Sequence, residues 1–110
     1  MPNVKIFVDQ IVFETRRTAI DSMLPKLRES LCVELSVPVA ACQLAVIPVL
    51  GMMDQPQANM EIQYLGTKDR TSQMITAACT VFRDIVQSAV GSVPAVRATP
   101  LDPTTYVALK

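Results

Sequence analysis

Histidine and tryptophan are absent from this 110-residue sequence, and only three glycines and three cysteines occur. Histidine is the side chain most often used as a general base near neutral pH and as a metal ligand, so the common catalytic triads and histidine metal sites are excluded. The few glycines form no phosphate-binding loop. We therefore expect a protein that works without a cofactor or a metal.

An excess of charge of one sign is also lacking, because ten basic residues balance ten acidic ones without any block of like charge. A nucleic-acid-binding module normally has a basic face, so nucleic acid is not expected as a partner. No apolar run approaches the roughly 18 residues of a membrane-spanning helix, and no signal-like segment is visible. We expect no membrane partner and a cytoplasmic location.

The cysteines Cys32, Cys42 and Cys79 are odd in number, lie in apolar surroundings and show no CxxC spacing. This pattern favours small buried residues in a reducing compartment over disulfides or a metal site. Apolar residues make up 50% of the chain, which is high for one small domain spanning residues 1–110. Part of the surface is therefore expected to be buried against other copies of the chain.

The first half of the chain predicts a strand, a helix and a second strand. Val4, Ile6 and Val8 alternate with other residues at the period of a strand, and apolar residues from Ile20 to Leu35 follow helical spacing. Pro25 interrupts this helical pattern, so we expect a kink or a break, with one helix ending near Ser22. After Ser36-Val37-Pro38 ends the helix, a largely buried strand is predicted over 40–50, and the stretch 10–14 is expected to be a bend.

The second half repeats this order about half a chain length later, giving repeats of about 2–55 and 56–110. A strand is predicted from Met60, and Asp69 is the predicted N-cap of a helix that ends near Gly91. The tripeptide Ser92-Val93-Pro94 then matches Ser36-Val37-Pro38. The apolar stripe of this helix is predicted to consist of Met74, Ala77, Ala78, Val81, Ile85 and Val86.

Two such units predict an α/β (α+β) fold, in which two parallel strand pairs form one four-stranded sheet. Right-handed crossovers place both helices on one face of that sheet. The other face is expected to be bare and apolar, and an oligomer would bury it. Beyond Arg97 we predict a tail with a short strand, Tyr106-Val107-Ala108-Leu109, which pairs with a neighbouring subunit.

Pro2 is the residue with the most unusual potential chemistry. Removal of Met1 would leave Pro2 as a secondary amine, and the strand that follows at once would hold this amine in place. An α-amino group has a pKa of about 7.7–8.0, and an apolar pocket or a nearby cation lowers that value. The neutral amine would then serve as a general base. The plain alternative is a processed terminus without a function.

A proline at the head of a strand, a duplicated strand–helix–strand unit and a predicted oligomer together resemble the tautomerase superfamily. This superfamily includes 4-oxalocrotonate tautomerase, 5-carboxymethyl-2-hydroxymuconate isomerase and macrophage migration inhibitory factor. The run from Gly66 to Thr71 and the final Ala108-Leu109-Lys110 are similar to the hydroxymuconate isomerase branch. The resemblance implies a homotrimer in which the proline moves a proton between an enol and a ketone carbon, without a cofactor.

The resemblance also implies roles for individual residues. Pro2 is the base, Arg70 binds a carboxylate or carbonyl oxygen, and the Leu65 amide lines the pocket. Tyr106 enters a neighbouring subunit's pocket, as C-terminal aromatic residues do in the inhibitory-factor branch.

The sequence departs from the family pattern at Gln43, where an arginine is expected on the strand after the first helix. Gln43 offers only neutral hydrogen bonds, so binding of a dicarboxylate is disfavoured. Arg97 could supply the missing positive charge, although the repeat register places it on Ala41. The predicted function is a keto-enol tautomerase for a small 2-oxo or 2-hydroxy-unsaturated acid.

Two alternatives remain open. One is a non-enzymatic oligomeric binding or scaffold protein on the same fold, which Gln43 favours. The other is a hydratase- or dehalogenase-type lyase in which Pro2 activates water.

Overall fold

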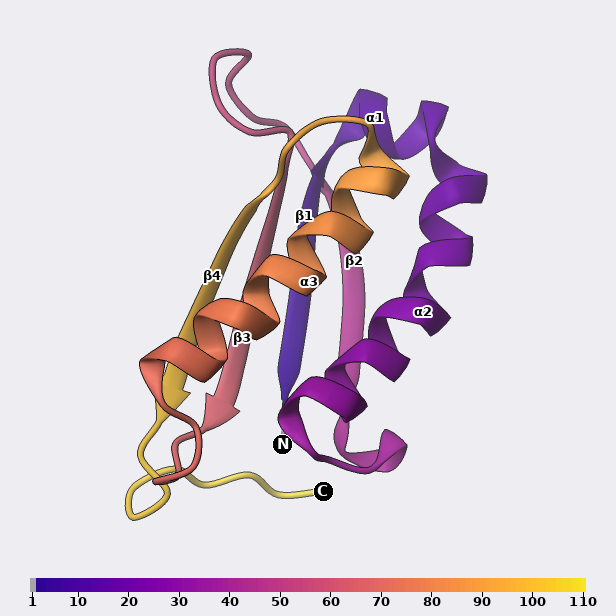
Figure 1. Cartoon of the computed structure of the whole chain (residues 1–110). Helices are drawn as coiled ribbons and strands as arrows, with labels where there is room; N and C mark the ends of the chain where they lie inside the picture. Colours follow the sequence, from indigo (N-terminus) through magenta and orange to yellow (C-terminus); the bar gives the residue numbers. More distant parts are fainter. Residues whose placement is uncertain (1) are drawn as a thin grey trace.

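The computed structural model describes residues 2–110, so Met1 and its predicted removal lie outside the described part of the chain. Strands and helices alternate in the order that two strand–helix–strand units require (Figure 1). In chain order the elements are β1 Asn3–Asp9, α1 Gln10–Thr15, α2 Arg17–Leu35, the 3-10 helix η1 Val39–Ala41, β2 Gln43–Val49, β3 Ala58–Leu65, α3 Ser72–Val90 and β4 Ala95–Leu101.

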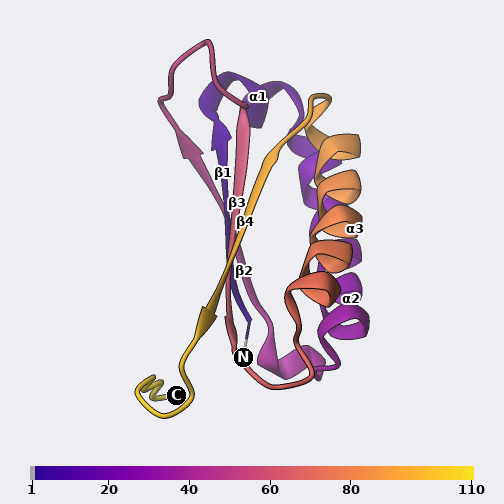
Figure 2. The ribbon, with the colours of Figure 1, turned by 60° about the vertical axis from the view of Figure 1, so that its left-hand side comes forward.

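The four strands form one sheet in the order β2-β1-β3-β4. β1 is parallel to β2 and β3 is parallel to β4, while the central pair β1 and β3 is antiparallel. Both long helices, α2 and α3, lie on the same face of the sheet (Figure 2). The predicted fold is therefore confirmed.

The core lies between this helical layer and the sheet. Val4, Ile6 and Val8 of β1 are fully buried, as the strand alternation predicts. Leu27 and Leu31 of α2 pack into the same core cluster, together with Phe82 of α3 and Met60 of β3. Burial of each such side chain contributes about 1.5–3 kcal/mol to the free energy of folding, so these contacts hold the helices against the sheet.

The predicted break at Pro25 is wrong, because α2 runs without interruption from Arg17 to Leu35. Pro25 is exposed, and its neighbours on the inner side, Met23 and Leu27, are buried. The packing of the inner side offsets the loss of one backbone hydrogen bond on the outer side. The structure has the short helix α1 where a bend was expected after β1. Asp9 is the N-cap of this helix, and its carboxylate accepts a 3.0 Å hydrogen bond from the amide of Ile11.

Helix α3 begins and packs differently from the prediction. Its N-cap is Thr71 rather than Asp69, because the Thr71 hydroxyl accepts a 3.2 Å hydrogen bond from the amide of Met74. Ala78 and Val86 are buried as predicted, but Ile75 and Phe82 are buried in place of Met74 and Val81. The predicted ends are confirmed: Gly91 adopts φ 86° after α3 and Ser36 adopts φ 53° after α2.

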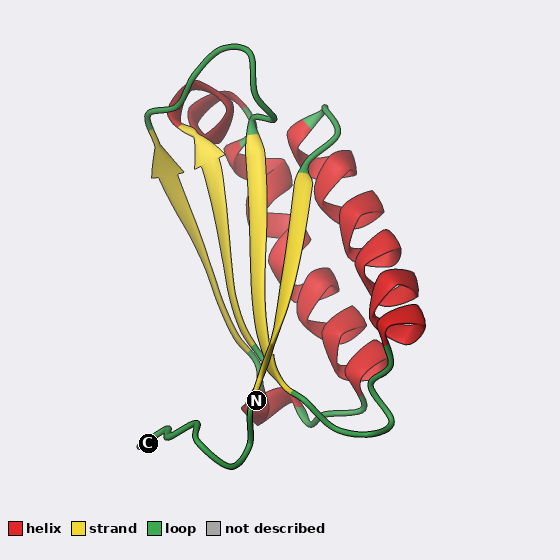
Figure 3. Cartoon of the chain, turned by 90° about the vertical axis from the view of Figure 1, so that its left-hand side faces the viewer, coloured by secondary structure: helices red, strands yellow, loops and turns green. Residues whose placement is uncertain are grey.

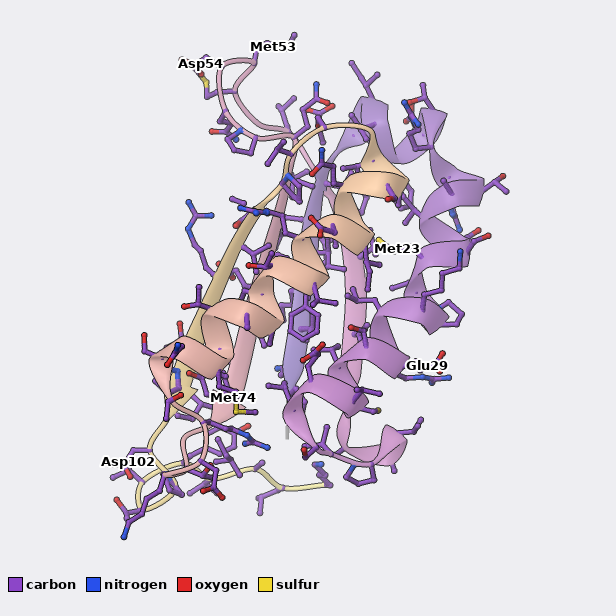
Figure 4. All side chains as sticks on the ribbon, viewed as in Figure 1. Met23, Glu29, Met53, Asp54, Met74 and Asp102 are labelled. Atoms are coloured by element: carbon purple, nitrogen blue, oxygen red, sulfur yellow. The ribbon has the colours of Figure 1, made fainter. Side chains whose placement is uncertain are left out.

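The prediction of a long buried strand over 40–50 is wrong. η1 occupies its first part, and β2 is a partly exposed edge strand from Gln43 to Val49. The long connection that follows β2 projects from the molecule, with Met53 and Asp54 at its tip (Figure 4).

After β4, the chain makes a turn at Asp102, whose carboxylate accepts hydrogen bonds from the amide and hydroxyl of Thr104 (Figure 4). The tail then carries no strand at 106–109 within this chain. Pairing of that segment with a neighbouring subunit stays a prediction.

The face of the sheet opposite the helices is bare, as predicted (Figure 3). Its predicted apolar character is found only in part: Phe7, Ile47 and Ala95 share one row of this face with Asn59. Two further rows are mainly polar, because the buried apolar residues of β1 and β3 point to the helices. One row consists of Gln43, Asn3, Gln63 and Thr99, and the next of Ala45, Lys5, Glu61 and Arg97.

Candidate functional site

Pro2 immediately precedes β1 and its side chain is fully buried. The carbonyl oxygen of Pro2 accepts a 3.1 Å hydrogen bond from the amide of Gln43, the first residue of β2. The parallel pairing of β1 with β2 continues from this contact, with Asn3 aligned to Gln43. The first described residue is therefore fixed in position by the sheet.

A hollow of about 430 Å³ lies beside Pro2. Three segments that are distant in the sequence form it: the start of β1, the junction between η1 and β2, and the C-terminal tail, which passes below the sheet near the N-terminal end of β1 (Figure 1). The residues that line it are Pro2, Asn3, Ala40, Ala41, Cys42, Gln43, Tyr106, Ala108, Leu109 and Lys110. The structure thus brings together the predicted site residues Pro2, Gln43 and Tyr106.

The residues that line the hollow include charged and neutral polar side chains. Among its described lining residues there is no Asp or Glu side chain, whereas Lys110 is basic. Gln43 and Tyr106 add neutral donors and acceptors of hydrogen bonds. These side chains can form hydrogen bonds with a polar ligand.

Cys42 also lines the hollow, and its Sγ lies 3.7 Å from the Sγ of Cys32 on α2. Burial raises the pKa of the Cys42 thiol to about 11, and the contact with Cys32 acts in the same direction, whereas the nearby Arg28 acts in the opposite one. The Cys42 thiol is therefore protonated near neutral pH and is a poor nucleophile. The three cysteines are free, and each is partly buried.

Arg70 does not line the hollow beside Pro2 in this chain. It borders a second hollow, of about 1100 Å³, which also contacts α3 and β4. The guanidinium of Arg70 donates hydrogen bonds of 2.6 Å to the carbonyl oxygen of Leu65 and 2.9 Å to that of Leu35. Arg70 thus connects the end of β3 with the end of α2. Leu65 takes part through its carbonyl, and it is not among the residues that line the Pro2 hollow.

Arg97 lies on the bare face of the sheet, where it is aligned with Glu61. Its Nη1 donates a hydrogen bond to the side-chain oxygen of Asn59. The predicted register of Arg97 with Ala41 is wrong. Lys5 and Glu61 are equivalent residues of the two repeats. Lys5 is aligned with Ala45 and Glu61 with Arg97, so Arg97 is the equivalent of Ala45. The insertion of η1 before β2 accounts for this shift.

Sequence reasoning missed the wall that Ala40, Ala41 and Cys42 form beside Pro2. The available signal was the predicted parallel pairing of the two strands, because the residues that begin the second strand must lie beside those that begin the first.

Over residues 2–110, no cluster of three or more His, Cys, Asp or Glu side chains is arranged to hold a metal ion. Within the same range, no helix is both long and apolar enough to cross a membrane.

No protein-family profile and no curated protein matches this chain. Solved structures do match it over nearly its whole length. A protein of unknown function from Vibrio cholerae is 22% identical, with 97% of this chain and 83% of that chain covered and a TM-score of 0.74. Macrophage migration inhibitory factor of Toxoplasma gondii is 13% identical, with 96% and 95% covered and a TM-score of 0.76.

A fused 4-OT, described as an asymmetric trimer, is 8% identical, with 96% of this chain and 91% of that chain covered and a TM-score of 0.76. At these identities the likeness establishes a shared fold. Nearly the whole chain therefore shares the fold of these proteins.

Proposed function

We propose that this chain is a member of the tautomerase superfamily and acts in the cytoplasm as a trimeric keto-enol tautomerase. Its substrate would be a small 2-oxo or 2-hydroxy-unsaturated acid, and Pro2 would be the general base. The observation that carries the proposal is the full burial of Pro2 beside a hollow without an Asp or Glu side chain. The fold shared with a macrophage migration inhibitory factor and a fused 4-OT supports it.

In the proposed reaction, the imino nitrogen of Pro2 is neutral because burial penalises its charged form. The nitrogen takes a proton from the carbon next to the substrate's carbonyl, so that the C–H bond breaks and an N–H bond forms. The electron pair moves onto the carbonyl oxygen to give an enolate. The enolate oxygen then takes up a proton from the solvent to give the enol, and the protonated Pro2 nitrogen releases its proton to the solvent. In the reverse direction the enol loses its O–H proton, and the protonated Pro2 nitrogen delivers a proton to the carbon, which gives the ketone.

The developing negative charge on oxygen requires hydrogen-bond donors. The side chains of Gln43 and Tyr106 border the same hollow as Pro2, and we assign them to the substrate's carbonyl and acid oxygens. A neutral amide binds a carboxylate more weakly than a guanidinium does. The site therefore favours a monocarboxylic 2-oxo acid, such as phenylpyruvate, over a dicarboxylate.

The two arginines contribute in different ways. Since the Arg70 guanidinium is bonded to the Leu35 and Leu65 carbonyls, we assign it to positioning the ends of α2 and β3. Arg97 lies on the bare face, which a trimer would bury, and there it would supply positive charge to a neighbouring subunit.

Ketonisation of enol-phenylpyruvate by the purified protein tests the proposal. Pro2→Ala should lower kcat/KM by about 10²- to 10⁴-fold, the usual contribution of a general base. Circular dichroism and the molar mass of the variant should be unchanged. Pro103→Ala, in the turn after β4, is the matched control and should retain full activity. A Pro2→Ala protein with unchanged activity would overturn the proposal.

A second candidate is a non-enzymatic binding or scaffold protein on the same fold. The observation that favours it is the engagement of Arg70 by two backbone carbonyls, which leaves no arginine among the described residues lining the Pro2 hollow. Intact-mass spectrometry of the purified protein separates the two candidates. A retained Met1 would block the amine and support the scaffold, whereas a chain that begins at Pro2 would support the enzyme.

A further inference from the structure

Two free thiols face one another where α2 and β2 approach. Cys32 lies in the last turn of α2 and Cys42 immediately precedes β2, and their Sγ atoms are 3.7 Å apart. This separation places the sulfurs in direct contact. Neither residue is exposed, so each side chain has limited freedom to turn away.

Backbone hydrogen bonds fix both cysteines in place. The carbonyl of Cys32 accepts a 3.1 Å hydrogen bond from the amide of Val37, which closes the end of α2. The amide of Cys42 donates a 3.1 Å hydrogen bond to the carbonyl of Val39 within η1. The intervening chain turns at Ser36 with φ 53° and returns through η1. The local fold therefore holds the two thiols together independently of any ligand.

We propose that Cys32 and Cys42 form a redox-responsive dithiol, which a low-molecular-weight disulfide converts into an intramolecular disulfide. The Cys32 thiolate attacks the disulfide, forms a mixed disulfide and releases one thiol. The Cys42 sulfur then attacks Cys32 and releases the second thiol, with loss of its own proton. The protein loses two electrons and two protons, and the small disulfide gains them.

The geometry needs only a small adjustment for this bond. The sulfurs must approach by roughly 1.7 Å from their 3.7 Å contact to reach the S–S length of about 2.05 Å. Burial keeps Cys42 protonated near neutral pH, so we assign the initial attack to Cys32, and Cys42 loses its proton only in the intramolecular second step. Cys79, on α3, has a thiol pKa that burial also raises, and it takes no part in the sulfur–sulfur contact of Cys32 and Cys42.

The bond would act on the candidate site because Cys42 lines two hollows. One is the hollow beside Pro2, and the other contacts Pro25 and Arg28 of α2. Drawing Cys42 toward α2 moves the wall shared by these hollows. Oxidation is therefore expected to change the binding of any ligand beside Pro2, whether or not the protein is a tautomerase.

Titration of the reduced full chain with oxidised glutathione tests the proposal. We expect a mass loss of about 2 Da without a glutathione adduct, and a fall in free thiols from the three of the reduced chain to Cys79 alone. Peptide mapping should locate the bond at Cys32–Cys42, and dithiothreitol should reverse it. Cys79→Ser is the matched control and should show the same mass loss.

Cys42→Ser should instead retain glutathione on Cys32, and circular dichroism should confirm that the variant is folded. Stable glutathione adducts on the unaltered protein, disulfides between chains, or a bond involving Cys79 would each overturn the proposal. A chain that keeps all three thiols at millimolar oxidised glutathione would also overturn it. Since thiol counts and masses do not depend on turnover, these outcomes are separate from the fate of the proposed tautomerase activity.

Discussion

A proline nitrogen is a useful base only where its protonated form is disfavoured. Two features provide this for Pro2: its complete burial, and the lack of an Asp or Glu side chain among the described residues of its hollow. Burial raises the free energy of a positive charge, and no Asp or Glu side chain of the hollow offsets this cost. In the proposed mechanism, the neutral amine is therefore the active form.

Arg70 gives the sharpest structural prediction for a single residue. Arg70→Ala removes both donors from the Leu35 and Leu65 carbonyls, and it should lower the free energy of unfolding by about 1–3 kcal/mol. Arg83→Ala, an exposed position on α3, is the control and should change it by less than about 0.5 kcal/mol. Urea unfolding followed by circular dichroism measures both. Equal effects of the two variants would show that Arg70 does not connect α2 with β3.

At the scale of elements, sequence patterns predicted the strands of the core and the ends of both long helices. Val4, Ile6 and Val8 follow a period that only a strand with one buried face satisfies. Patterns failed where tertiary packing outweighs local preference, as at Pro25, where buried neighbours keep α2 continuous. They also failed where two caps compete, because a threonine and an aspartate are both good N-caps and the register of α3 selects Thr71.

The C-terminal end of α3 supports a prediction about an element. Gly91→Ala should destabilise the fold by about 1–2 kcal/mol, because φ 86° is strained for any residue with a Cβ. The added carbon would also lie 2.5 Å from the Nη2 of Arg16. Gly51→Ala is the matched control, since its added carbon meets only the mobile end of Gln55 and should cost less than about 0.5 kcal/mol. Thermal unfolding compares them, and equal melting temperatures would contradict this account of the cap.

For the whole molecule, the sequence predicted the layered architecture, but it did not predict the site as the structure presents it. The duplicated order of elements was sufficient to predict the four-stranded sheet and the two helices that cover one of its faces. The hollow beside Pro2 also depends on how the C-terminal tail folds back toward β1, and local patterns carry no signal for such a distant contact. For the same reason, the sequence did not show that Arg70 contacts α2 and β3 rather than the Pro2 hollow.

The bare face of the sheet leads to a prediction about assembly. Glu61 lies between Lys5 and Arg97 in one row of this face, so Glu61→Lys would align like charges across three strands. If the proposed trimer buries this face, the variant should elute as the 12.0 kDa monomer in light-scattering chromatography, while the unaltered protein elutes as three copies. Glu29→Lys makes the same change of charge on the exposed outer side of α2 and should remain trimeric (Figure 4). A trimeric Glu61→Lys protein would place the interface elsewhere.

The state of the Pro2 nitrogen itself is the most direct test of the catalytic account. Nuclear magnetic resonance of protein labelled with ¹⁵N-proline can follow the terminal imino nitrogen as the pH is varied. The account predicts a signal that titrates with a midpoint below the ordinary α-amino range of about 7.7–8.0. A midpoint at or above that range, or the signal of an amide nitrogen still joined to Met1, would contradict it.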